Sequence, residues 1–147
     1  IGGGNMAEAI IKGLLREDSP ATLMVAEISV ERRSHLAKTY PGIRVVENSA
    51  QAAAWGDVII LAVKPQQAAT VLTTIRQAVG PGKLVVSIMA GVRSASLEET
   101  LESGARVVRV MPNTPALAGS GATAICAGQN ASKADLDCVE TIFARTG

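Results

Sequence analysis

The sequence predicts an α/β fold in which helices cover both faces of a doubly wound, mostly parallel sheet. Short apolar runs recur along the chain, and they are continuous, as is typical of buried parallel strands. Stretches with helical spacing separate these runs, so strand and helix alternate as in right-handed βαβ units. Strands are expected at residues 23–26, 44–46, 58–63, 84–88 and 107–110, after a truncated first strand at residue 1.

Helical spacing predicts the elements between these strands. The first helix, over residues 5–15, has apolar side chains at Met6, Ile10 and Leu14. Glu8 and Lys12 lie four residues apart on it and are expected to pair. Residues 96–99, with the sequence SLEE, have the pattern of a capping box that begins a later helix. Further helices are expected at residues 31–39, 50–54, 66–79 and 132–145.

Composition excludes several classes of function. The 147 residues are enough for one domain, and 48% of them are apolar. A net charge of +1 and only three aromatic residues argue against a nucleic-acid partner. No apolar run is long enough to predict a membrane span, and no cluster of side chains predicts a metal site. Cys126 and Cys138 are expected to be reduced thiols, which indicates a cytoplasmic protein.

A glycine-rich motif opens the chain. Residues 2–7, with the sequence GGGNMA, fit the dinucleotide-binding pattern G-x-G-x-x-A of Rossmann-like folds. Its first glycine allows a tight turn, its second lets the backbone approach a diphosphate, and the small third residue lets the helix pack against the strand. A plain strand-to-helix turn is the alternative. The cofactor-binding candidates of this motif are Ile1, Gly2, Gly3, Gly4, Asn5 and Met6.

The end of the strand at residues 23–26 gives conflicting signals about the nucleotide. Glu27 follows that strand, where a carboxylate usually binds the ribose 2′-hydroxyl of NAD and repels the 2′-phosphate of NADP. Ser29, Arg32 and Arg33 come next and could bind that phosphate. Alternatively, Ser29 caps a helix and the two arginines are surface charges. The cofactor is therefore expected to be NADP or NAD.

Other candidates follow the later strands, because ligands of doubly wound sheets bind at the carboxyl ends of strands. Lys64 is either close to a bound anion or an ordinary surface lysine, and Asn48 is either a helix cap or an adenosine contact. Asn113 and Thr114 lie between two prolines that make their loop rigid. The end of the strand expected at 58–63 adds the cofactor-binding candidates Ala62, Val63, Lys64 and Pro65.

Four segments together resemble pyrroline-5-carboxylate reductase. They are IGGGNMA at 1–7, AVKPQ at 62–66, SIMAGV at 87–92 and RVMPNTPA at 109–116, and the resemblance covers essentially all 147 residues. It implies hydride transfer from NAD(P)H to a small-molecule substrate, 1-pyrroline-5-carboxylate, in the last step of proline synthesis. It also implies that Asn113 and Thr114 face the nicotinamide and substrate. The residues that it places along the nicotinamide are Ile88, Met89 and Ala90.

The resemblance further implies a C-terminal, all-helical domain that forms a homo-oligomer and most of the substrate pocket. Residues 1–147 are accordingly expected to be the dinucleotide-binding domain of a longer two-domain enzyme, inactive by itself. Glu27 departs from the small polar residue often found at its position, but the family and the two arginines favour NADPH slightly. The alternatives are another NAD(P)-dependent imine or β-hydroxyacid reductase, and a dinucleotide-sensing module without catalysis.

Overall fold

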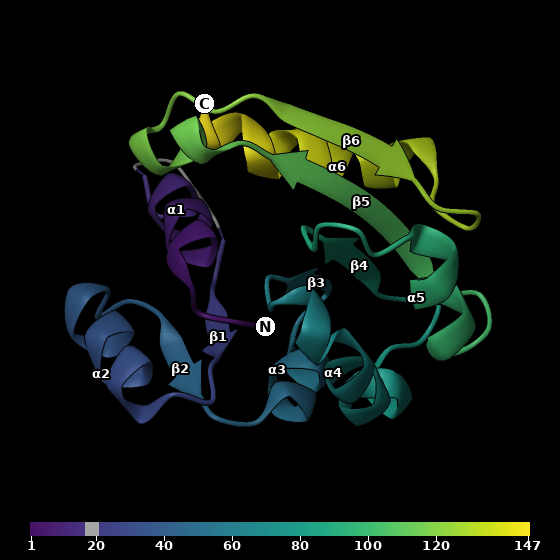
Figure 1. Cartoon of the computed structure of the whole chain (residues 1–147), viewed down its shortest axis with the longest axis horizontal. Helices are drawn as coiled ribbons and strands as arrows, with labels where there is room; N and C mark the ends of the chain where they lie inside the picture. The colour runs from purple at the N-terminus through teal and green to yellow at the C-terminus, as the bar shows by residue number, and fades with distance from the viewer. Residues whose placement is uncertain (17–20) are drawn as a thin grey trace.

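The computed structural model describes residues 1–16 and 21–147, and its strands form a mostly parallel arrangement (Figure 1). One pair of parallel strands comprises β1 (Met24–Ala26) and β2 (Arg44–Val46). The other strands, in spatial order, are β3 (Val58–Leu61), β4 (Leu84–Ser87), β5 (Arg106–Pro112) and β6 (Thr123–Ala127). All of these neighbours are parallel except β6, which is antiparallel to β5. The predicted α/β class with a mostly parallel sheet is confirmed.

Residues Ile1 and Gly2 join the two groups of strands. The Ile1 carbonyl accepts a hydrogen bond from the Ala62 N–H at 2.8 Å, and the Gly2 N–H donates to the Ala26 carbonyl at 2.8 Å. Figure 1 shows the N-terminus between β1 and β3. The strand order therefore reverses at Ile1 and Gly2, which is the switch point where doubly wound sheets bind ligands.

The helices lie between the strands in sequence. They are α1 (Asn5–Leu14), α2 (Val30–Thr39), α3 (Ser49–Trp55), α4 (Ala68–Ile75), α5 (Ser94–Thr100) and α6 (Lys133–Phe143). Short 3₁₀ turns are η1 (Pro65–Gln67), η2 (Arg76–Ala78), η3 (Thr114–Ala118) and η4 (Ala144–Thr146). The helix expected at 66–79 is thus α4 flanked by two of these tighter turns.

The core explains why the strand sequences are continuously apolar. Val85 and Val107 face a buried cluster beneath α3, α4 and α5, whereas Val86 and Val108 face a second cluster beneath α1 and α6. Successive residues of a strand point to opposite faces, so a strand covered on both faces needs apolar residues at every position. A smaller third cluster packs α2 against α1 and β1.

Two local expectations were wrong or incomplete. No strand was predicted at β6, which pairs with β5 along the edge of the sheet. The capping box expected at Ser96 is absent, because the N-cap of α5 lies three residues earlier, at Arg93, whose side chain makes no capping bond. A capping box forms instead at α6, where Ser132 and Asp135 exchange hydrogen bonds.

Candidate functional site

The glycine motif forms a tight turn from the switch point into α1. Gly2 has a φ of +95°, and a Cβ there would lie 2.6 Å from the Ala62 carbonyl oxygen. Gly4 is the N-cap of α1, where no side chain caps the helix and a Cβ would meet nothing within 4 Å. Ala7 is buried, so α1 packs closely at its start. The open N-terminus of α1 fits a diphosphate, which needs free N–H groups and close backbone approach.

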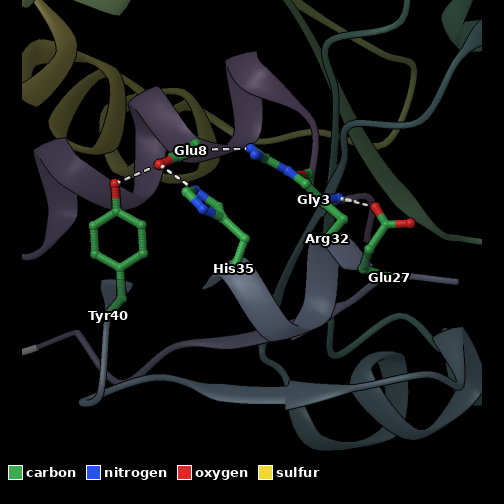
Figure 2. Close-up of polar contacts among 6 residues, drawn as sticks. All are labelled: Gly3, Glu8, Glu27, Arg32, His35 and Tyr40. Atoms are coloured by element: carbon green, nitrogen blue, oxygen red, sulfur yellow. Dashed lines mark hydrogen bonds and ion pairs between the residues drawn. The ribbon is translucent and has the colours of Figure 1, made fainter. Parts of the chain in front are cut away.

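Glu27 lies directly beside this turn, as Figure 2 shows. Its Oε2 accepts a hydrogen bond from the Gly3 N–H at 2.7 Å, and its Oε1 accepts one from the Ser29 N–H at 2.8 Å. Two backbone donors therefore fix the carboxylate between the glycine turn and the start of α2. This places Glu27 where the sequence predicted an acidic ribose ligand.

Both arginines after Glu27 are engaged with protein groups. Arg32 donates through Nε to the Gly3 carbonyl and through Nη2 to Glu8 Oε2, the latter at 2.5 Å. Arg33 donates through Nη1 to the carbonyls of Glu27, at 2.7 Å, and Ile28, at 2.8 Å, and it reaches Glu47 through Nη2 at 3.2 Å. The arginines thus brace the turn that holds Glu27.

Glu8 is the centre of a polar cluster that joins α1 to α2 (Figure 2). Besides Arg32, its Oε1 accepts a hydrogen bond from the Tyr40 hydroxyl at 2.9 Å and lies 3.2 Å from His35 Nε2. The expected pair with Lys12 does not form. Burial opposes ionisation of Glu8, but the bonds from Tyr40, His35 and Arg32 outweigh it and lower its pKa to about 2. Burial and the adjacent Glu8 carboxylate raise the pKa of Tyr40 to about 12.

Ser29 and Asn48 are both helix caps. The Ser29 hydroxyl accepts from the Arg32 N–H at 3.2 Å at the start of α2, and Asn48 Oδ1 accepts from the Ala50 N–H at 2.8 Å at the start of α3. These bonds give each residue a structural role. Their contacts with a nucleotide stay predictions.

The segments after β3 and β4 continue the same rim of the sheet. Ala62 and the half-buried Val63 border Gly2, whereas Lys64 and Pro65 are exposed. The Ile88 N–H donates to the Leu61 carbonyl at 3.1 Å and so lies beside the end of β3. Ala90 is exposed, but Met89 is only 2% exposed and packs in the core beneath α4 and α5. The Met89 side chain therefore does not line the rim.

Asn113 and Thr114 follow the end of β5, as expected, and both are exposed. Asn113 Oδ1 accepts a hydrogen bond from the Ala122 N–H at 2.9 Å, so this side chain also holds the connection from β5 to β6. Thr114 begins the 3₁₀ turn η3, which packs against α1. The loop is thereby tied to the helix that starts at the glycine motif.

Among residues 1–16 and 21–147, no set of three His, Cys, Asp or Glu side chains is placed to hold a metal ion. Within the same residues, no helix has both the length and the apolar character needed to cross a membrane. Cys126 and Cys138 are both free thiols.

Comparisons with known proteins agree with this geometry. A family model described as "NADP oxidoreductase coenzyme F420-dependent" matches residues 1–91. The pyrroline-5-carboxylate reductase of Pseudomonas aeruginosa is 39% identical over 148 residues, which cover 100% of this chain and 54% of that protein. The chain spans about half the length of the curated relatives that it matches.

Two solved structures are similar over nearly the whole chain. A pyrroline-5-carboxylate reductase from Coxiella burnetii has a TM-score of 0.92 at 31% identity, covering 99% of this chain and 54% of its own. A Plasmodium falciparum pyrroline carboxylate reductase with NADP bound has a TM-score of 0.84 at 30% identity, covering 99% of this chain and 53% of its own.

Proposed function

Because the chain belongs to the family described as NADP oxidoreductase, coenzyme F420-dependent, we propose that it is the dinucleotide-binding domain of a two-domain pyrroline-5-carboxylate reductase. The observation that carries the proposal is similarity to such reductases along the whole chain. It includes the residues after β5, beyond the part that the family model matches.

The site residues would bind NADPH or NADH and orient it at the switch point. The free N–H groups at the start of α1 would hold the diphosphate, and Glu27 would lie at the adenosine ribose. When bound, the cofactor supplies the hydride that reduces the C=N bond of the substrate to give L-proline. The exposed Asn113 and Thr114 would face the nicotinamide and substrate.

We also propose that the complete enzyme is a cytoplasmic homo-oligomer. The free thiols of Cys126 and Cys138 support a reducing compartment. The resemblance to the reductases supports an additional helical domain that joins the subunits and closes the substrate pocket.

Steady-state oxidation of NAD(P)H by the complete protein with 1-pyrroline-5-carboxylate tests the proposal. Turnover is expected, and Thr114→Val should lower it at least about tenfold, or 1.4 kcal/mol, if the hydroxyl orients the substrate. Thr73→Val is the matched control, because Thr73 is exposed on α4 and its hydroxyl donates a hydrogen bond to the Ala69 carbonyl of the same helix at 2.9 Å.

Failure of this assay would separate the alternatives. Reduction of other imines or oxidation of β-hydroxyacids, without turnover of 1-pyrroline-5-carboxylate, would identify a different reductase. Dinucleotide binding without turnover of any of these substrates would indicate a sensing module.

A further inference from the structure

The turn between β1 and α2 carries two arginines that could attract a 2′-phosphate, but the structure shows what each of them holds. Arg32 donates hydrogen bonds to the Gly3 carbonyl and to Glu8. The Arg32 side chain is only 25% exposed and that of Glu8 only 17%. Arg33 is bonded to two backbone carbonyls of the turn and to Glu47. A 2′-phosphate would have to compete with these acceptors for both cations.

The carboxylates bonded to this turn and its two arginines leave no positive surplus. Glu8, Glu27 and Glu47 contribute three carboxylates, against the two guanidinium groups of Arg32 and Arg33. His35 adds a positive charge only when protonated, and it also faces Glu8. A phosphate monoester placed here would meet a turn that is negative on balance.

Glu27 is held in place by its neighbours. Withdrawing its carboxylate to admit a phosphate would break the bonds from the Gly3 and Ser29 N–H groups together. A ribose 2′-hydroxyl, in contrast, can donate to this carboxylate, because each carboxylate oxygen accepts more than one hydrogen bond. The fixed geometry therefore suits a free ribose.

We propose that Glu8 and Glu27 together make this site select NADH over NADPH. Glu27 is the direct determinant, since its carboxylate lies where the 2′-substituent of the ribose binds in this kind of fold. Glu8 is a positioning residue, because it acts by retaining Arg32 (Figure 2). The inference rests on the dinucleotide site of the proposed function, and it reverses the slight preference for NADPH that the sequence suggests.

Fluorescence titration of the complete protein with NADH and with NADPH measures the preference without any substrate. NADH is expected to bind about tenfold more tightly than NADPH, because the 2′-phosphate of NADPH would face the fixed carboxylate of Glu27. Glu27→Gln should reduce this ratio to about two or less. Tighter binding of NADPH by the unmodified protein would overturn the proposal.

The part played by Glu8 has its own test. Glu8→Gln should tighten NADPH binding about threefold to tenfold relative to NADH, because Arg32 is released from its ion pair. The gain should disappear in the double variant Glu8→Gln/Arg32→Met, which a general loosening of the loop would not produce. Glu102→Gln removes the same charge at the exposed pair with Arg76 and should leave the ratio unchanged. An unchanged ratio in Glu8→Gln would refute the positioning role.

The outcomes distinguish this inference from the proposed function. A protein that reduces 1-pyrroline-5-carboxylate but prefers NADPH overturns only the inference. One that prefers NADH but does not reduce the imine overturns only the proposed reaction. Binding of neither dinucleotide overturns both.

Discussion

Strands β3, β4 and β5 lie within extensive apolar clusters. Strand β1, which leads into the candidate nucleotide turn, contacts only a small apolar cluster. Among the residues that the structure describes, thirteen buried ones form the cluster beneath α3, α4 and α5, and four form the cluster beneath α2, namely Ile11, Val25, Leu36 and Ile43. Around β1 and α2, the polar cluster of Glu8 adds hydrogen bonds between α1 and the segment of α2. A scaffold fixed by apolar packing thus supports a turn that depends more on hydrogen bonds.

This difference suits the roles of the two regions. Apolar packing on both faces gives the sheet a fixed geometry, and its strand ends set the rim. Hydrogen bonds that are partly exposed each contribute only about 0.5–1.5 kcal/mol, so the nucleotide turn can be adjusted by single substitutions without unfolding the sheet.

The largest expected effects test the two apolar clusters. Leu97 and Leu36 are both fully buried, so Leu97→Ala and Leu36→Ala should each lower the free energy of unfolding by about 2–5 kcal/mol. Only Leu36→Ala should also weaken NADH binding, because the Leu36 side chain packs against Gly3 in the glycine turn. A Cβ added to Gly3 would lie 2.7 Å from Leu36 Cδ1. Denaturant unfolding and NADH titration measure the two properties. An equal loss of affinity in Leu97→Ala would contradict the division into scaffold and turn.

The two outer glycines of the motif should separate stability from binding. Gly2→Ala introduces a Cβ 2.6 Å from the Ala62 oxygen at a φ of +95°, so the protein should lose at least about 2 kcal/mol of stability. A Cβ at Gly4 would meet no heavy atom within 4 Å, so the stability of Gly4→Val should change by less than about 1 kcal/mol. Calorimetry should nevertheless show NADH affinity reduced at least about tenfold, or 1.4 kcal/mol, because the side chain meets the diphosphate. Unchanged affinity would exclude the diphosphate from this turn.

Acid should remove the contribution of Glu8 to stability. The folded state lowers the pKa of Glu8 from its usual 4.5 to about 2, so folding favours the ionised carboxylate. Its contribution is complete above about pH 5 and is lost as the pH falls from 4.5 towards 2. At pH 7, Glu8→Gln should cost about 1–2 kcal/mol, and this difference from the unmodified protein should shrink by pH 3. A difference that grew on acidification would contradict the assignment.

The sheet could be predicted from sequence where burial alone determines a strand. β3 and β4 appear as apolar runs because helices cover both of their faces. β6 gave no such signal, since three of its five residues are exposed and its position depends on pairing with β5. The start of α5 was misplaced because SLEE has the residues of a capping box, although Arg93 precedes the first turn.

The candidate site was predictable to the extent that it follows strand ends. The proximity of Glu27 to Gly3 was implied because the glycine motif and Glu27 each follow neighbouring strands. The bond from Arg32 to Glu8 could not be predicted, because 24 residues separate the two. The i,i+4 spacing on the helix favoured a pair between Glu8 and Lys12 instead. Tyr40 and His35 join the same cluster only after α2 has packed beside α1. The burial of the Met89 side chain was not predictable from its neighbours, because Ile88 and Ala90 reach the surface. A contact of residue 89 with the nicotinamide stays a prediction.

The smallest expected effect comes from an ion pair on the scaffold. Arg76 Nε lies 3.6 Å from Glu102 Oε1, and the two side chains are 56% and 50% exposed. Water screens such a pair and neither side chain is fixed, so Glu102→Gln should change the free energy of unfolding by less than about 0.5 kcal/mol. Glu8→Gln removes the same charge but leaves three donors, Arg32, His35 and Tyr40, without their carboxylate. Denaturant unfolding of the two variants at pH 7 compares them directly. If Glu102→Gln were as destabilising as Glu8→Gln, the polar cluster would stabilise the nucleotide turn no more than a surface ion pair does.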